Sequence, residues 1–154
     1  MINPEDLRIG DLVKVSRDCM FPKGTICTVL DINPPKVFKD KKGVVTLSAV
    51  NDDDDGPWGV WCSNTEGIPL TSEILELNGW NKRTFNIQLK KSVREKYEYR
   101  LPQTALNIEY CPYYMQINER FTVYGDCFMI KHIEYVHELQ HILWVLGLDA
   151  ELNV

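Results

Sequence analysis

Short segments in which apolar residues alternate with polar ones dominate the first part of the chain. Glycine, proline or runs of charged residues separate each of these segments from the next. The segments cover residues 12–15, 25–32, 44–50 and 58–62. Short strands at this spacing are typical of a small barrel or a strongly bent sheet. We therefore predict a compact, barrel-like β unit over residues 1–67.

The same alternation continues in the second part of the chain, over longer segments. These segments cover residues 84–89, 96–101, 106–110, 120–124 and 127–130. Clean alternation predicts antiparallel strands with one face on a core and the other in water. Between the last two segments, Gly125-Asp126 predicts a two-residue hairpin loop, because both residue types tolerate a positive φ.

Two helices are predicted beside these strands. Thr71 is a suitable N-cap for a short helix over residues 71–78. A longer C-terminal helix over residues 132–147 ends at Gly147, the residue type most common just after a helix. The predicted fold class is therefore α+β, and residues 68–154 form an antiparallel sheet that packs with both helices, and with the N-terminal unit, as one globule.

The longer helix has an apolar side and a polar side. The apolar arc consists of Tyr135, Val136, Leu139, Ile142, Leu143 and Leu146. The polar side consists of Glu134, His137, Glu138 and His141. We expect the apolar arc to pack on the core and the polar side to face solvent or a cleft.

Composition places the chain among ordinary globular proteins. It has 154 residues, of which 44% are hydrophobic and 25% charged. The N-terminus lacks the basic and apolar regions of a signal peptide, and no apolar run is long enough for a membrane span. The five cysteines are odd in number and form no C-x-x-C pair, which favours free thiols in a reducing compartment. We expect a cytoplasmic protein with no membrane partner.

The charge distribution argues against nucleic acid as the main partner. The formal net charge is −5, so no global field attracts a polyanion. Residues 71–118 nevertheless carry seven basic and five acidic residues. Lys90, Lys91 and Arg94 are the candidate polyanion contacts in this region, and the alternative is a solvated strand face. Nucleic-acid binding through them would be weak, sequence-independent and sensitive to salt.

One string on the C-terminal helix has the spacing of a zinc site. His137, Glu138 and His141 match H-E-x-x-H. Two histidines four residues apart project from one helix face and can hold one Zn²⁺, while the glutamate beside them activates a bound water. This spacing defines the alternative hypothesis, a small metallopeptidase-like hydrolase with Glu138 as its catalytic residue.

A catalytic zinc also needs a third protein ligand. The usual downstream histidine is absent, since Gly147 occupies its position, and the upstream candidates His132, Asp126 and Glu134 are poorly placed to complete a tetrahedron. We therefore predict no catalytic residue, no metal and no cofactor, and treat the histidines as surface residues. Replacing His141 by Asn is then expected to change the free energy of unfolding by no more than about 0.5 kcal/mol.

Two stretches near the N-terminus resemble a known kind of barrel. Residues 10–15, followed by residues 22–25 and 28–30, are similar to the opening of SH3-like barrels of the KOW type. In these barrels a strand is followed by a glycine turn and a second strand. The resemblance implies an SH3-like fold for the N-terminal unit, and fold alone implies no function.

A second resemblance extends over the whole chain. Residues 133–147 resemble the C-terminal helix of a group of uncharacterised small proteins from gut-bacterial (Bacteroidetes-type) phages and mobile elements. Members of this group commonly end in a string similar to Y-V-H-Q-L-Q-N-L-Y-F-A-L-T-G. Residues 7–11 and 68–75, with Gly79-Trp80, resemble the other two landmarks of the group.

This chain differs from the group at the H-E-x-x-H string, because Glu138 and His141 replace the usual Gln and Asn. The resemblance therefore implies that the string arose on a non-catalytic scaffold. Our leading hypothesis is a non-enzymatic accessory protein of a phage or mobile element that binds a protein partner. The zinc-dependent hydrolase is the alternative, and a weak nucleic-acid binder is the second alternative.

Overall fold

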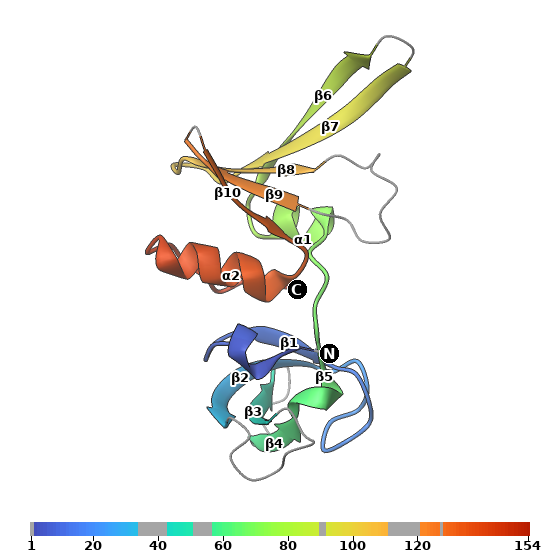
Figure 1. Ribbon diagram of the computed structural model, residues 1–154, viewed down its shortest axis with the longest axis vertical. Helices are drawn as coiled ribbons and strands as arrows, with labels where there is room; N and C mark the ends of the chain where they lie inside the picture. The colour runs from blue at the N-terminus through green and yellow to red at the C-terminus, as the bar shows by residue number, and fades with distance from the viewer. Residues whose placement is uncertain (1, 34–42, 51–56, 90–91, 111–120, 127) are drawn as a thin grey trace. The chain divides into compact units, whose positions relative to one another are not determined.

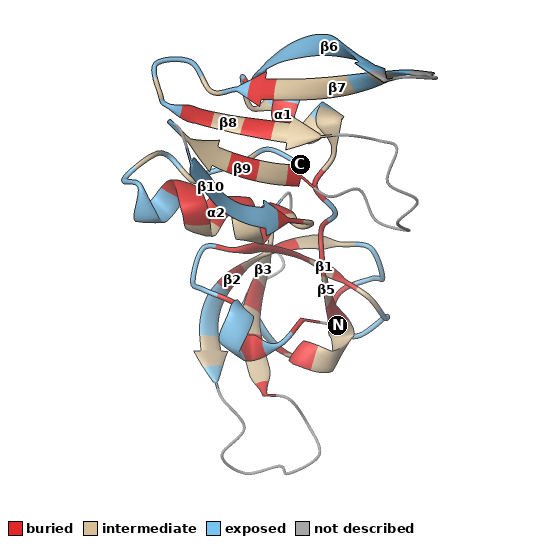
Figure 2. Cartoon of the chain, turned by 45° about the horizontal axis from the view of Figure 1, so that its top comes forward, coloured by how far each residue is buried: buried red, intermediate tan, exposed pale blue. Residues whose placement is uncertain are grey.

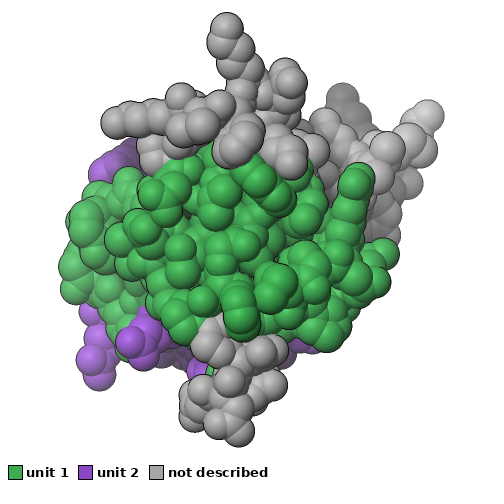
Figure 3. Space-filling view, turned by 90° about the horizontal axis from the view of Figure 1, so that it is seen from below, with its two compact units in different colours: residues 1–68, 139–150 green, residues 69–138, 151–154 purple. Residues whose placement is uncertain are grey.

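A computed structural model of the chain shows an α+β fold with two antiparallel sheets and one main C-terminal helix, as the sequence predicts (Figure 1). The described residues are 2–33, 43–50, 57–89, 92–110, 121–126 and 128–154. They form two compact units, which Figure 3 colours separately. Unit 1 consists of Met1–Ile68 and Leu139–Ala150, and unit 2 of Pro69–Glu138 and Glu151–Val154.

Unit 1 contains a five-stranded antiparallel sheet of strand order β4-β3-β2-β1-β5. Its elements are η1 (Pro4–Asp6), β1 (Leu12–Val15), β2 (Ile26–Asn33), β3 (Val44–Ala49), β4 (Trp58–Trp61), η2 (Cys62–Asn64) and β5 (Thr65–Gly67). The first four strands lie where the alternation predicts them. Strand β5 was not predicted, because its three residues, Thr-Glu-Gly, are too few to show a period. It pairs with β1 on the side away from β2, and in the described chain β4 and β5 are the two ends of the sheet.

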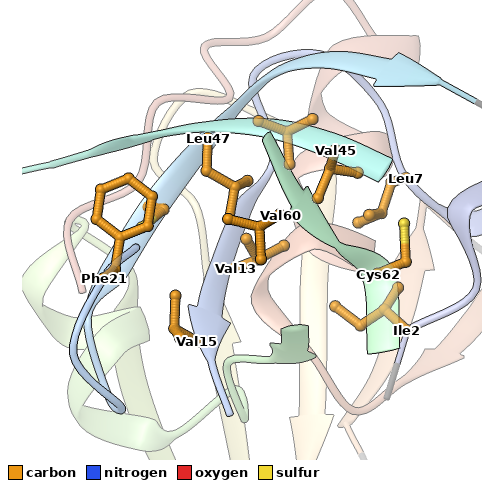
Figure 4. Close-up of a cluster of buried hydrophobic side chains, with 11 residues drawn as sticks. Ile2, Leu7, Val13, Val15, Phe21, Val45, Leu47, Val60 and Cys62 are labelled. Atoms are coloured by element: carbon orange, nitrogen blue, oxygen red, sulfur yellow. The ribbon is translucent and has the colours of Figure 1, made fainter. Parts of the chain in front are cut away.

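The core of unit 1 follows directly from the period of its strands. In β1 the side chains of Val13 and Val15 are fully buried, whereas Lys14 between them points out and pairs with Glu66 of β5 at 3.0 Å. Figure 4 shows the resulting cluster. Its members are Ile2, Leu7, Val13, Val15, Phe21, Cys27, Val29, Val45, Leu47, Val60 and Cys62.

Unit 2 contains the second antiparallel sheet, of order β10-β9-β8-β7-β6. Its elements are α1 (Ser72–Leu77), β6 (Asn81–Leu89), β7 (Ser92–Arg100), β8 (Leu106–Tyr110), β9 (Phe121–Gly125) and β10 (Phe128–Ile133). The cap of α1 is confirmed, since Thr71 Oγ1 accepts a hydrogen bond from the Ile74 N–H at 3.3 Å. The inner face of the sheet supplies Tyr99, Ile108, Phe121, Val123 and Ile133 to the core, all fully buried.

The C-terminal helix α2 (Val136–Val145) begins later than predicted, because residues 128–133 continue the hairpin as β10. Ile133 pairs with Phe121 of β9 and is fully buried, so the strand persists to that residue. The hairpin loop is also shifted by one position. Gly125 pairs with Phe128, and Asp126 has the positive φ (41°) that the turn requires.

Three cysteines lie in the described residues, and all three are free thiols. Cys27 and Cys62 are buried in unit 1, and Cys19 is exposed. Burial, with a smaller contribution from nearby Cys19, raises the pKa of Cys27 to about 11, and burial also raises the pKa of Cys62. Both thiols therefore stay protonated and unreactive at neutral pH. Cys111 and Cys127 lie outside the described residues.

The described part of the chain contains no helix with the length and apolar composition needed to cross a membrane.

Candidate functional site

Glu138 acts as an N-terminal cap of α2. Its Oε2 accepts hydrogen bonds from the backbone N–H groups of Glu134 (2.8 Å) and Tyr135 (3.2 Å). Its Oε1 accepts one from Lys131 Nζ at 2.7 Å. A glutamate in the first turn that reaches back to the N-cap backbone is one half of a capping box. The carboxylate of the H-E-x-x-H string is thus held against the start of its own helix.

The ionisation of Glu138 agrees with this role. Partial burial acts to raise the pKa of its carboxyl group. The hydrogen bonds from the Glu134 backbone and from Lys131 outweigh burial, so the pKa lies below its ordinary value. The group is therefore a structural carboxylate, ionised at neutral pH.

His137 is buried, contrary to the expectation that the polar side of the helix faces solvent or a cleft. Only 4% of its surface is exposed, and its ring stacks on Tyr135 with centroids 5.7 Å apart. The apolar and polar sides of the helix did not predict this, because more than half of the residues of α2 are buried. The buried helix residues are Val136, His137, Leu139, Gln140, Ile142 and Leu143.

His141 pairs with a buried carboxylate of unit 1. Its Nε2 donates to Asp11 Oδ1 and Oδ2, at 2.9 and 2.8 Å. Asp11 is 2% exposed, and its Oδ2 also accepts the Arg8 N–H at 2.7 Å. The turn that presents Asp11 needs Gly10, whose φ is +95° and whose N–H donates to the Val29 carbonyl at 2.8 Å.

Gln140 forms hydrogen bonds with the same turn, on both sides of Asp11. Its Oε1 accepts the Leu12 N–H at 2.9 Å. Its Nε2 donates to the carbonyl oxygens of Gly10 (3.2 Å) and Ala150 (3.1 Å). We call the four residues Gly10, Asp11, Gln140 and His141 the polar junction of unit 1. They satisfy one another's buried polar groups, which indicates a role in holding the fold.

Sequence reasoning missed Asp11 as a partner of His141, because 130 positions separate the two residues. The sequence did single out this turn in another way, because residues 7–11, which include Gly10 and Asp11, resemble one of the stretches shared by the group of small phage proteins. His132, considered above as a third zinc ligand, lies on β10, where its Nδ1 is 2.8 Å from Thr122 Oγ1.

The residues of the H-E-x-x-H string therefore have separate surroundings. Glu138 caps a helix, His137 packs on Tyr135, and His141 pairs with Asp11. Over the described ranges, no three side chains of His, Cys, Asp or Glu are grouped so that they could hold a metal ion.

A different kind of candidate site lies on the hairpin of unit 2. Within the described residues, strand β7 pairs with β6 along Ser92–Arg100 and with β8 along Tyr97–Arg100. In this part of the chain, residues 85–89 and 92–96 therefore form a two-stranded extension beyond the rest of the sheet, which we call the arm (Figure 1). Strand β6 is also an end strand, so one of its long sides is open in the described structure.

The arm exposes apolar side chains. Phe85, Ile87 and Val93 are 44%, 40% and 58% exposed. Every side chain described in β6, over residues 81–88, is exposed, as the pale blue of Figure 2 shows. A hairpin of two strands cannot bury such apolar residues by itself.

Basic residues share one face of the hairpin with the apolar pair Phe85 and Ile87. Directly paired residues project to the same face, and Phe85 pairs with Lys96 while Ile87 pairs with Arg94. Arg83, two residues before Phe85, projects to this face as well. We call it the outer face. Of the three candidate polyanion contacts, Arg94 is thus placed on β7, and Lys90 and Lys91 lie outside the described residues.

The hairpin differs in charge from the chain as a whole. Strands β6 and β7 contain five basic residues, Lys82, Arg83, Arg94, Lys96 and Arg100, and two acidic ones, Glu95 and Glu98. Their balance is +3, in a chain with a net charge of −5. Lys96 is paired with Glu109. Arg83 lies directly opposite Glu98 of β7, so the outer face also carries one acidic residue of this hairpin.

Comparison with protein-family models, with curated proteins and with solved structures finds no match to this chain.

Proposed function

We propose that this chain is a non-enzymatic accessory protein of a phage or mobile element that acts by binding a protein partner through its β6–β7 arm. The observation that carries the proposal is the exposure of Phe85, Ile87 and Val93 on a two-stranded extension. An isolated hairpin is marginally stable in water, so a partner that covers these apolar side chains would stabilise the arm. The phage or mobile-element origin rests on the sequence resemblance.

We also propose that unit 1 is an SH3-like barrel of the KOW type. Five short antiparallel strands, with β5 returning to pair with β1, support this assignment. The buried free thiols of Cys27 and Cys62 support a reducing, cytoplasmic location. In this proposal the barrel stabilises the protein, and the arm supplies the binding surface.

The zinc-dependent hydrolase has less support than the binding function. Glu138 would have to activate a water molecule between the two histidines, but both of its oxygens accept hydrogen bonds at the start of α2. His141 would have to release Asp11 in order to bind a metal through Nε2. We therefore place the function on the arm.

Site-specific photo-crosslinking tests the proposal. A photoreactive phenylalanine analogue at position 85, in cells that naturally carry the gene, is expected to give a discrete protein adduct. The matched control is the same analogue at position 9, because Ile9 is 70% exposed but lies in unit 1. Equal adducts from both positions, adducts that nuclease removes, or no adduct from position 85 would overturn the proposal.

A further inference from the structure

We propose that the partner presents an extended acidic segment, which adds to unit 2 as a sixth strand along the open side of β6. This inference rests on the proposed function and deepens it by naming the recognition mode. Strand addition gives affinity through backbone hydrogen bonds and specificity through alternate side chains.

The open side of β6 is regular over its whole length. All nine residues of β6 pair with β7 without a shift in register. In such a ladder every second residue turns its N–H and C=O away from the partner strand. Among the residues that the structure describes, the edge therefore offers a row of donors and acceptors without a neighbouring strand, roughly 30 Å long.

The opposite end of the sheet is different. Strand β10 has a register shift between Met129 and Lys131. Natural sheets use bulges of this kind, and proline, to block unwanted strand addition. Strand β6 has neither device. Of the two end strands, β6 is the one that suits an added strand.

The outer face specifies the chemistry of the added strand. Arg83, Phe85 and Ile87 are among the residues of β6 that would flank it on this face. Residues opposite Phe85 and Ile87 should be apolar, and the residue opposite Arg83 should be acidic. An antiparallel segment would then follow the pattern Φ-x-Φ-x-(D/E), where Φ is apolar, and a parallel one would show it reversed.

Two other occupants fit the surface less well. A second copy paired along β6 would bring together two hairpins that each have a balance of +3. A nucleic acid would use the basic side chains, but it would leave the backbone edge and the exposed Ile87 unused. An acidic segment alone uses the edge, the apolar pair and the charge.

Peptide selection tests this mode. The full-length protein is presented with a displayed library of random peptides, and enriched sequences are measured by fluorescence anisotropy. We expect the alternating pattern with an acidic residue at its end. Arg83→Glu and Phe85→Ala should each weaken binding at least tenfold. The control Arg17→Glu makes the same charge change at an exposed residue of unit 1 and should leave affinity unchanged.

A charge swap makes the selection sharper. The same library presented to the Arg83→Glu variant should enrich Lys or Arg where the native protein enriches Asp or Glu. In addition, amide hydrogen exchange should slow at alternate residues of β6 when a selected peptide binds. Melting curves confirm that each variant is folded. Failure to reverse the charge preference, or protection that does not alternate, would overturn the proposal.

The remaining outcomes identify the other occupants. A concentration-dependent dimer that Phe85→Ala dissociates would replace the acidic segment with a second copy. Tight binding of a 20-base-pair DNA or RNA duplex, with no peptide pattern enriched, would replace it with nucleic acid. If position 85 crosslinks a protein but no alternating peptide is selected, strand addition fails while the proposed function stands. If position 85 gives no protein adduct and no alternating peptide is selected, both strand addition and the proposed function are wrong.

Discussion

At the scale of single residues, the most informative pair is Asp11 and His141. The sequence placed His141 on a solvent-facing side with little effect on stability, but it donates to a carboxylate that is 2% exposed. A buried carboxylate that loses a donor keeps its desolvation cost without compensation. The earlier expectation of a change within about 0.5 kcal/mol on replacing His141 therefore has to be revised.

We now expect His141→Asn to lower the free energy of unfolding by about 2 kcal/mol, because Asp11 loses its side-chain partner. Urea unfolding at neutral pH measures the change. The matched control is His132→Asn, an exposed histidine on β10, with an expected change of at most about 0.5 kcal/mol. Combined with Asp11→Asn, the two changes should be non-additive, and strict additivity would show that the pair is not coupled.

At the scale of elements, the period of the strands predicted most of them correctly, whereas the sequence did not predict which residues of the C-terminal helix are buried. Except for β5, the strands of both sheets were predicted because their residues alternate with a period of two. The cap at Thr71 was predicted because capping chemistry is local. A helical wheel shows which residues are apolar, but it does not show how much of the helix is covered. That is why the burial of His137 was missed. The start of α2 was missed because residues 132–133 suit a strand as well as a helix.

The cap formed by Glu138 should make the stability of α2 depend on pH. Hydrogen bonds hold the pKa of Glu138 below its ordinary value, so its stabilising effect is present above that value and is lost as the pH falls through the lowered pKa. Glu138→Gln should therefore cost about 1 kcal/mol at pH 7.

The difference between wild type and Glu138→Gln should shrink as the pH falls through the lowered pKa of Glu138, because the wild-type group then becomes protonated. Melting temperatures of both proteins across this range measure it. Glu5→Gln, at an exposed glutamate of η1 in unit 1, serves as the control and should follow the wild type. A difference that stays constant at every pH would assign the effect to packing.

At the scale of the whole molecule, charge sets the behaviour toward polyanions. The chain has a net charge of −5, while β6 and β7 together have a balance of +3. The sequence showed a basic region, but the pairing that places Arg94 beside Ile87 on one face appears only in the structure. Alternation identifies strands without identifying their neighbours, so register could not be predicted.

We expect the protein to bind a 20-base-pair DNA duplex weakly and without sequence preference, because only a few cations of the hairpin can meet phosphates. Gel-shift titrations should show the complex at about 50 mM salt and lose it by about 200 mM. Arg94→Ala should weaken it, and Arg17→Ala, in unit 1, should not. Tight binding that survives the higher salt would contradict this expectation.

The register shift in β10 has a consequence for assembly. Because β6 is regular and β10 is not, the sheet of unit 2 can accept an added strand at the β6 end but not at the β10 end. Head-to-tail stacking of sheets into a filament needs two receptive ends on every subunit. A chain with one receptive end stops growing after a single addition, so the complex it forms is limited to one bound strand per protein, however high the concentration.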